Sequence, residues 1–186
     1  ERPPSQVVAQ NSSYVTVDGE FDSLEDRSFL TMDDYELSGE NVILRIDINS
    51  SINPENGDLL DDTRIKRHSA TVKELSDKNA RVIVLAHQSR PGKLDFVSLK
   101  KHSERMSKII GREIKFVDDI YGKKAIQEIK NIKNGQIILL DNVRFDEEEI
   151  NLKTFENDNF MTQSKARMVK TLAPHASYFV NDAFAA

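Results

Sequence analysis

Polar and basic side chains follow three apolar segments of this sequence, at the points where those segments end. Asp47 and Asn49 follow NVILRI, His87 and Arg90 lie in HQSRPGK after RVIVLA, and Arg144 lies in DNVRF after IILL. In open α/β sheets, ligands bind outside the carboxyl ends of the strands. We therefore expect these side chains to lie together at one edge of a sheet, with Asp47 and Asn49 on the same side of the extended chain.

Arg64 should reach the same edge, because it lies in the first turn of the helix predicted after NVILRI. Three arginines and a histidine from three connections would repel one another unless an anion offset their charge. The planar fork of arginine binds carboxylate or phosphate at two points, and Asp47 would accept a hydrogen bond from a hydroxyl group. These residues predict a site for a small phosphorylated hydroxy acid.

Each of these residues also has an ordinary structural interpretation. Taken singly, an Asp or Asn at a strand end is most often a turn residue. Arg144 could be a surface base that pairs with Glu147 or Glu148, and the segment 91–93, PGK, is predicted to be only a turn that contains Lys93. The recurrence of bases at one edge favours the binding site over these alternatives.

Other reactive groups are scarce. His68 is predicted on a helix flank, His102 near the apolar face of its helix, and His175 in a loop, and none has the spacing of a metal ligand set. Cysteine is absent, which excludes thiol nucleophiles and Cys-ligated metals. No strand is followed by a P-loop or a G-x-G-x-x-G motif, so we expect no metal and no nucleotide cofactor in this chain.

The composition fits one domain of 186 residues. The net charge of −5 argues against nucleic-acid binding, while the bases that follow Arg64 could form a local patch for a small anion. No apolar segment reaches the roughly 20 residues that cross a bilayer. Residues 1–27 have no signal-peptide pattern, so we expect a cytoplasmic protein without membrane contact.

Short β-branched runs alternate with amphipathic helical stretches, which predicts βαβ units. Continuous apolar runs such as VIVLA and IILL are typical of strands that are covered on both faces. The expected fold is a single three-layer α/β/α domain with a doubly wound, Rossmann-like parallel sheet and helices on both faces. The predicted strands are Val42–Ile48, Arg81–Ala86, Ile114–Val117, Ile137–Leu140 and Tyr178–Val180.

Four helices are predicted between the strands. The first is capped by Asp61 and Asp62 and runs to about Lys78, and the second runs from Ser98 to Ile110, before Gly111. The third is marked by Ala125, Ile126 and Ile129, and the fourth, ended by Pro174, carries Met161, Met168, Val169 and Leu172. Residues 146–159 are expected to form an exposed connection. Residues 1–27 are expected to be a partly ordered extension, in which Tyr14–Val17 could form a short strand, so that the domain proper is 28–186.

Six segments, in order, resemble the N-terminal half of phosphoglycerate kinase, in a form closest to the archaeal branch: VILRIDINSSI, DDTRI, VIVLAHQSRPG, SLKKHSERMSKIIGREIKFVDD, ILLDNVRFDEEE and YFVNDAFAA. The resemblance covers Phe29–Ala186. It implies a substrate lobe that binds 3-phosphoglycerate or 1,3-bisphosphoglycerate, facing a C-terminal lobe of the same protein that binds Mg-ADP or Mg-ATP. The implied activity is phosphoryl transfer between 1,3-bisphosphoglycerate and ADP in glycolysis or, reversed, in gluconeogenesis.

The resemblance also implies roles for particular residues. Arg64 would be catalytic, lying nearest the acyl phosphate, and His87, Arg90 and Arg144 would grip the phosphate that is not transferred. Asp47 and Asn49 would contact the hydroxyl and carboxyl end of the substrate. The implied substrate-binding residues are Asp47, Ile48, Asn49, Arg64, His87, Gln88, Ser89, Arg90 and Arg144.

Three departures from the family pattern stand out. Asp141 replaces the usual Glu, Ser89 stands where many members have Gly, and the chain stops after NDAFAA, before the usual His-Arg. The nucleotide lobe is outside the sequence, so we expect these residues alone to bind 3-phosphoglycerate without catalysing turnover. The alternative is a non-catalytic α/β module that binds a phosphate ligand or a nucleotide.

Overall fold

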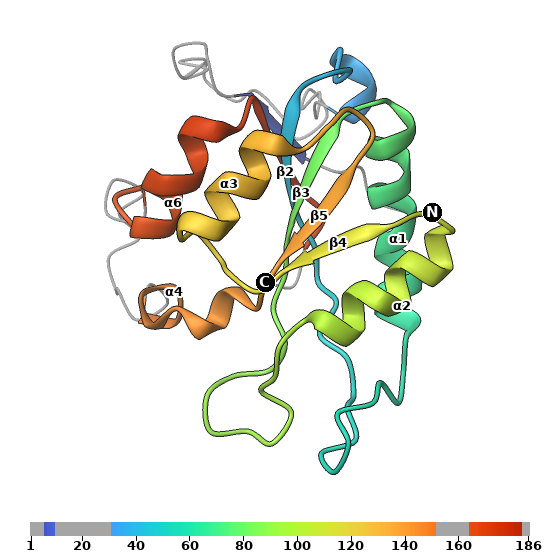
Figure 1. The fold of residues 1–186 in the computed structure, drawn as a ribbon, viewed down its shortest axis with the longest axis vertical. Coiled ribbons are helices and arrows are strands. Elements are labelled where there is room, and N and C mark those ends of the chain that lie inside the picture. The colour runs from blue at the N-terminus through green and yellow to red at the C-terminus, as the bar shows by residue number, and fades with distance from the viewer. Residues whose placement is uncertain (1–5, 10–30, 152–163, 184–186) are drawn as a thin grey trace, which may run out of the picture.

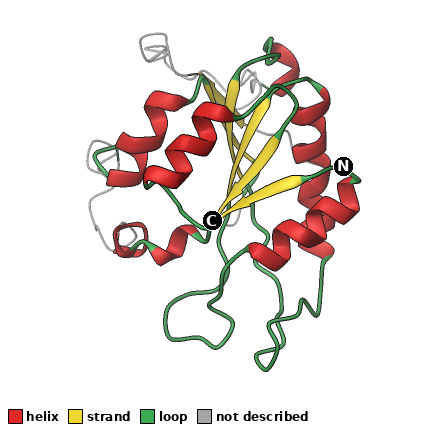
Figure 2. Ribbon diagram, viewed as in Figure 1, coloured by secondary structure: helices red, strands yellow, loops and turns green. Residues whose placement is uncertain are grey.

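Six strands form one sheet between two layers of helices in the computed structural model, which describes residues 6–9, 31–151 and 164–183 (Figures 1 and 2). The strand order is β1-β6-β2-β3-β5-β4, with every neighbouring pair parallel except β1 and β6. The doubly wound α/β fold predicted from the sequence is thus confirmed. The strands are β1 Gln6–Ala9, β2 Asn41–Arg45, β3 Arg81–Leu85, β4 Ile114–Val117, β5 Ile137–Leu140 and β6 Tyr178–Asn181.

The N-terminal strand β1 is an addition to the predicted sheet. It pairs antiparallel with β6 at one edge, within the region expected to be an extension. The short strand suggested for Tyr14–Val17 lies outside the described residues.

The helices cover the two faces of the sheet in pairs, with α1 and α2 on one side and α3 and α6 on the other (Figure 1). Gly111, with a φ of 70°, ends α2 as predicted, because glycine adopts the left-handed conformation at little cost. The helices are α1 Thr63–Asp77, α2 Lys100–Ile110, α3 Lys123–Asn131, α4 Glu147–Asn151 and α6 Arg167–Leu172, with 3-10 helices η2 Met32–Asp34, η3 Val143–Phe145 and η5 Ala173–His175.

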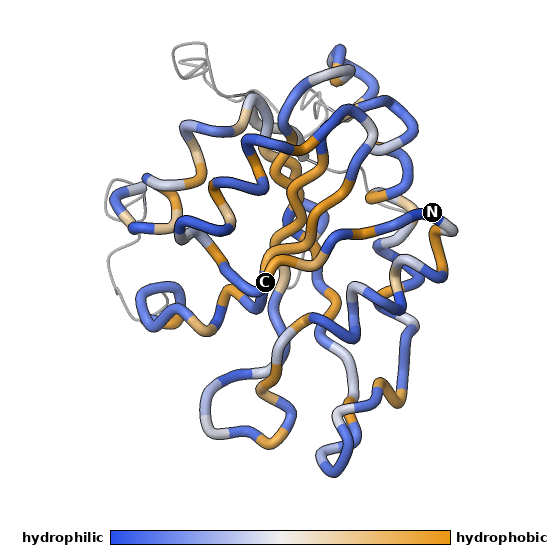
Figure 3. The backbone as a smooth tube through the Cα atoms, viewed as in Figure 1, coloured by the Kyte–Doolittle hydropathy of each residue, from blue (hydrophilic) through white to orange (hydrophobic). Residues whose placement is uncertain are grey.

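Strands β2 to β6 contribute to two apolar cores, one on each face of the sheet. Leu44, Val84 and Leu139 pack with α1 and α2, while their neighbours Ile43 and Ile138 pack with α3 and α6. Successive side chains of a strand point to opposite faces, so the part of a strand that is covered on both sides has to be apolar. The apolar strands consequently form the centre of the molecule in Figure 3.

Strand β2 and the connection after η3 differ from the sequence prediction. Strand β2 ends at Arg45 and not at Ile48, because the chain beyond it turns its polar groups toward the loop after β3. The connection predicted to start at residue 146 instead begins with helix α4, where Asp146 Oδ1 accepts a hydrogen bond of 3.1 Å from the backbone N–H of Glu148. Three successive glutamates open this helix, and the N-terminal end of a helix favours negative charge.

Helix α6 is shorter than the fourth predicted helix. It ends at Leu172, and Pro174 and His175 continue into the 3-10 helix η5 and not into a loop. Leu172 is buried as expected, whereas Val169 is 40% exposed and does not belong to the apolar stripe. Met161 lies outside the described residues.

Candidate functional site

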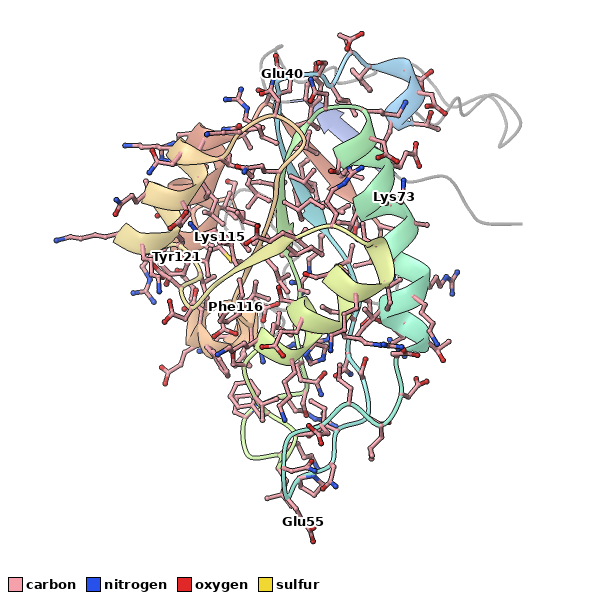
Figure 4. The ribbon with its side chains drawn as sticks, turned by 45° about the vertical axis from the view of Figure 1, so that its right-hand side comes forward. Glu40, Glu55, Lys73, Lys115, Phe116 and Tyr121 are labelled. Carbon is pink, nitrogen blue, oxygen red and sulfur yellow. The ribbon has the colours of Figure 1, made fainter. Side chains whose placement is uncertain are left out.

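Two long loops, 46–62 and 86–99, extend together beyond the carboxyl ends of β2 and β3 (Figure 1). Figure 4 places Glu55 at the far tip of the first loop, while Glu40, which precedes β2, lies at the opposite end of the molecule. Lys101 of α2 ties this loop down, since its Nζ lies 2.6 Å from the carbonyl oxygen of Asn56 and 2.7 Å from Asp58 Oδ1. These bonds anchor the 46–62 loop to α2.

Arg64 and Asp47, which were both predicted to lie at this edge, form an ion pair there. The Asp47 side chain is only 10% exposed, whereas that of Arg64 is 51% exposed. Asp47 also accepts a hydrogen bond of 3.1 Å from the backbone N–H of Asn49. Arg64 is thus held by a mostly buried carboxylate while about half of its side chain stays exposed.

A hollow of about 540 Å³ lies between the two loops and η3. Four of the predicted site residues line it. A further base, Lys93, also lines it, although the sequence predicted Lys93 to be only a turn residue. Its position three residues after Arg90, in the same loop, is the signal that could have found it. The lining residues are Asn49, Ser89, Arg90, Lys93, Asp95, Arg144 and Ile150.

Ser89 organises the wall of this hollow. Its backbone N–H donates to Asn49 Oδ1 at 2.9 Å, its Oγ donates to Asp95 at 2.6 Å, and its carbonyl oxygen accepts from Arg144 Nη1 at 2.7 Å. The residue has a φ of 56°, a left-handed backbone conformation that is uncommon for residues other than Gly, Asn or Asp. These three contacts hold Ser89 in that conformation and join both loops to Arg144.

Gln88 and Ile48 are predicted site residues whose side chains are fully buried. Ile48 packs in the core, so that only its backbone could face a ligand. Gln88 joins the two loops internally: its Oε1 accepts from Ser50 N and its Nε2 donates to Ser50 O, both at 2.9 Å. Oε1 also lies 3.1 Å from His102 Nε2. Gln88 therefore positions the loops from behind the hollow.

His102 is a neutral member of this network. Burial lowers the pKa of its imidazole from 6.5 to about 4. Because Gln88 Oε1 is an acceptor, the ring proton has to reside on Nε2, and among the described residues Nδ1 has no hydrogen-bonding partner. The prediction that His102 lies near the apolar face of its helix is confirmed, and the structure adds its bond to Gln88.

This pKa predicts a pH dependence of stability. The unfolded chain takes up a proton at this imidazole near pH 6.5 and the folded chain only near pH 4, so stability should rise as the pH increases through this window. The difference corresponds to on the order of 3 kcal/mol. Urea unfolding of wild type and His102→Gln at pH 4.5 and 7.5 measures it. The glutamine variant should lose this part of the slope, and equal slopes would show that His102 is not buried in neutral form.

Asn142 and Asp141 connect the end of β5 to the same loops. Asn142 Oδ1 accepts from the backbone N–H groups of Gln88 and Arg144, both at 3.2 Å, and Nδ2 donates to the carbonyl oxygens of Gln88 and Val97 at 2.8 and 3.1 Å. Asp141 Oδ1 accepts from the backbone N–H of Leu99 at 2.9 Å, just before α2. The shorter acid in the place of the usual Glu thus has a structural role here.

Arg45, Arg144 and Glu149 form a buried charge cluster next to the hollow. Arg45 Nη2 lies 3.6 Å from Glu149 Oε1 and 3.4 Å from His87 Nδ1, and Arg144 Nε lies 4.0 Å from Glu149 Oε2. Burial lowers the pKa of Arg45, and Glu149 counteracts this effect. Arg144 therefore faces Glu149 and neither Glu147 nor Glu148, which were considered from the sequence.

Sequence reasoning missed Arg45 and Glu149. Arg45 lies two residues before Asp47, so the alternation that pairs Asp47 with Asn49 could have included it. Glu149 had no comparable signal, because its position depends on α4, which the acidic stretch did not predict.

His68 is not a helix-flank residue, contrary to the sequence prediction. It is buried, and its Nδ1 lies 2.9 Å from Asp182 Oδ2, the oxygen to which Thr71 Oγ1 donates at 2.6 Å. This cluster fastens α1 to the end of β6. In the described part of the chain, no group of three or more His, Asp or Glu side chains could hold a metal ion, and no helix is long and apolar enough to span a bilayer.

A larger hollow, of about 710 Å³, lies along α3, but its chemistry differs. Its bases are the exposed Lys123 and Lys130 of a single helix, with no arginine. A phosphate is recognised best by arginine forks and backbone N–H groups that converge from different segments. The smaller hollow at the carboxyl edge is therefore the better candidate for a phosphate site.

The fold is that of an open α/β protein, and basic side chains line a hollow at the carboxyl edge of its sheet. The sequence model of the family described as "Phosphoglycerate kinase" matches residues 32–186, and the chain belongs to that family.

Archaeal proteins are among the relatives to which the chain is most similar. The phosphoglycerate kinase of Methanothermobacter thermautotrophicus is 48% identical over 158 residues, which cover 85% of this chain and 37% of that protein. That of Methanococcus maripaludis is 50% identical over 160 residues, with 85% and 39% covered. The crystal structure of phosphoglycerate kinase from Pyrococcus horikoshii gives a TM-score of 0.75 at 30% identity, with 83% of this chain and 36% of that chain covered. The chain thus spans well under half the length of these relatives.

Proposed function

We propose that this chain is the N-terminal, substrate-binding lobe of a phosphoglycerate kinase, which binds 3-phosphoglycerate or 1,3-bisphosphoglycerate at the carboxyl edge of its sheet. The observation that carries the proposal is the convergence of Arg90, Lys93 and Arg144 from two connections around one hollow. The proposed activity of the whole protein is phosphoryl transfer between 1,3-bisphosphoglycerate and ADP, in glycolysis or gluconeogenesis, in the cytoplasm.

The arrangement supports different roles for different residues along the carboxyl edge. The bases of the hollow would hold the phosphate that is not transferred, together with His87, whose Nδ1 lies 3.4 Å from Arg45 Nη2. Asp47 and Asn49, and the backbone of Ile48, would contact the hydroxyl and carboxyl end. Arg64, fixed by Asp47 but half exposed, would stabilise the negative charge of the phosphoryl group during transfer.

The nucleotide belongs to the partner lobe in this proposal. Mg-ADP or Mg-ATP would be the second substrate, held by the C-terminal lobe of the same protein. The 186 residues contain no glycine-rich phosphate loop, which supports a division between the two lobes. The role of this chain would be to orient the phosphoglycerate and present Arg64.

Calorimetric titration tests the proposal. The chain should bind 3-phosphoglycerate and not ADP, and Arg90→Ala should weaken binding roughly tenfold, since one exposed charge-assisted contact is lost. The control is Lys130→Ala, which removes an exposed base from α3 and should leave the affinity within twofold of wild type.

Binding of ADP in place of 3-phosphoglycerate would favour the nucleotide-binding module considered from the sequence. Binding of neither ligand by a chain whose circular dichroism shows a folded α/β protein would remove the support for a phosphoglycerate site.

A further inference from the structure

The carboxylate of Glu149 occupies a position between two arginines of the site. Its two oxygens divide between them, with Oε1 3.6 Å from Arg45 Nη2 and Oε2 4.0 Å from Arg144 Nε. The three side chains are only 15%, 14% and 17% exposed for Arg45, Glu149 and Arg144, so solvent screens these charges weakly. A negative charge that belongs to the protein thus lies against the bases expected to hold a ligand.

The contacts of this carboxylate are incomplete. Its Oε2 is buried and has no hydrogen-bonding partner among the described residues, although it lies close to Arg144. Both separations exceed the 2.7–2.9 Å of a good charge-assisted hydrogen bond. Glu149 therefore offsets part of the charge of the two guanidinium groups without a short bond to either, which leaves them able to form better bonds with another anion.

Arg144 is where the two anions would meet. Its Nη1 donates to Ser89 O at 2.7 Å, inside the lining of the hollow, while its Nε faces Glu149. Nε and its neighbouring amino group form one of the forks by which arginine binds carboxylate or phosphate at two points. A phosphate in the hollow and the carboxylate of Glu149 would compete for the same donors.

Helix α4 can let the carboxylate withdraw. It has only five residues, and none of them is fully buried. A helix this short has little stability of its own, so a small displacement of α4 should cost little beyond the exposed bonds that Arg167 donates to Glu148.

We propose that Glu149 is an internal counter-anion of the site: it holds Arg45 and Arg144 together without ligand and gives up Arg144 when the phosphate of the substrate binds. Glu149 is thereby a positioning residue that limits affinity and favours release of product. This inference rests on the proposed function, because it assumes that a phosphate enters the hollow.

Glu149→Gln provides the test, since glutamine keeps the shape and removes the charge. In calorimetry on the full chain, this variant should bind 3-phosphoglycerate about five- to tenfold more tightly than wild type, as expected for one competing charge at a partly buried site. Its melting temperature without ligand should fall, because Arg45 and Arg144 then repel each other. The rise in melting temperature on addition of 3-phosphoglycerate should be larger than in wild type.

Glu147→Gln is the matched control. It lies two residues away in the same helix and makes the same charge change, but the side chain is exposed. Its affinity should stay within twofold of wild type. If Glu149→Gln does not fold, Glu149→Asp, which draws the carboxylate back by one methylene, should show a smaller gain in affinity.

The outcomes are distinguishable. Unchanged or weaker binding by a folded Glu149→Gln, while wild type binds 3-phosphoglycerate, would overturn the role of Glu149 and leave the proposed function intact. An equal gain in Glu147→Gln would likewise overturn it, since net charge alone would then be the cause. Failure of wild type and of all variants to bind would overturn the proposed function, and this inference with it.

Discussion

Arg144→Ala should weaken binding of 3-phosphoglycerate by about 100-fold, or roughly 3 kcal/mol. The side chain is expected to make charge-assisted bonds to the phosphate, and it also fixes the wall of the hollow through its bond of 2.7 Å to Ser89 O. Its loss would remove the strongest anion contact and loosen the loop that presents Arg90. Calorimetry with 3-phosphoglycerate measures the change, which should exceed that of Arg90→Ala because Arg90 is exposed.

Arg112→Ala is the control for this experiment. Arg112 precedes β4, at the opposite end of the sheet, where it bonds to Ser76 Oγ at 2.6 Å and to Asp77 at 2.8 Å. The substitution removes the same charge from the chain and should leave the affinity within twofold. A loss of less than fivefold for Arg144→Ala, with the fold intact, would place the phosphate elsewhere.

Asn142→Ala should destabilise the folded chain by about 3–4 kcal/mol. Its fully buried amide makes four hydrogen bonds to backbone groups, and alanine would leave the N–H and the carbonyl of Gln88 and the carbonyl of Val97 without that partner. Since these groups are in the loop that carries Ser89 and Arg90, binding should weaken as well. Equilibrium unfolding in urea measures the loss of stability.

Asn56→Ala is the matched substitution at an exposed position. Asn56 Oδ1 accepts one hydrogen bond of 2.9 Å, from the backbone N–H of Asp58 at the turn of the 46–62 loop. Water replaces such a bond, so the expected loss is at most about 1 kcal/mol. Similar losses for the two variants would mean that the Asn142 network contributes little to stability.

Much of the fold follows from the sequence because burial on both faces leaves a simple pattern. Strand β5 is apolar throughout and β3 is apolar after Arg81, and the helices between them have one apolar face, so their positions could be predicted closely. The end of β2 could not be predicted in this way. Ile46 and Ile48 continue its apolar run, and only the hydrogen bonds that Asn49 and Ser50 make to the next loop explain why the strand stops at Arg45.

The candidate site was predictable where its residues lie directly after strands. Asn49, Ser89, Arg90 and Arg144 line one hollow because parallel strands end at the same edge. The hydrogen bonds of the buried amides that hold these residues in place were not predictable. A buried amide such as Gln88 or Asn142 looks in the sequence like any loop residue, since its partners are backbone groups that only the tertiary fold brings near.

The most direct test of the phosphate site is an NMR titration of the uniformly 15N-labelled chain with 3-phosphoglycerate. The largest changes in chemical shift should arise from the backbone amides around the hollow at the carboxyl edge, those of Asn49, Ser89, Arg90, Lys93 and Arg144. Changes confined to the hollow along α3, from Tyr121 to Asn131, would contradict this prediction, as would a spectrum that 3-phosphoglycerate leaves unchanged.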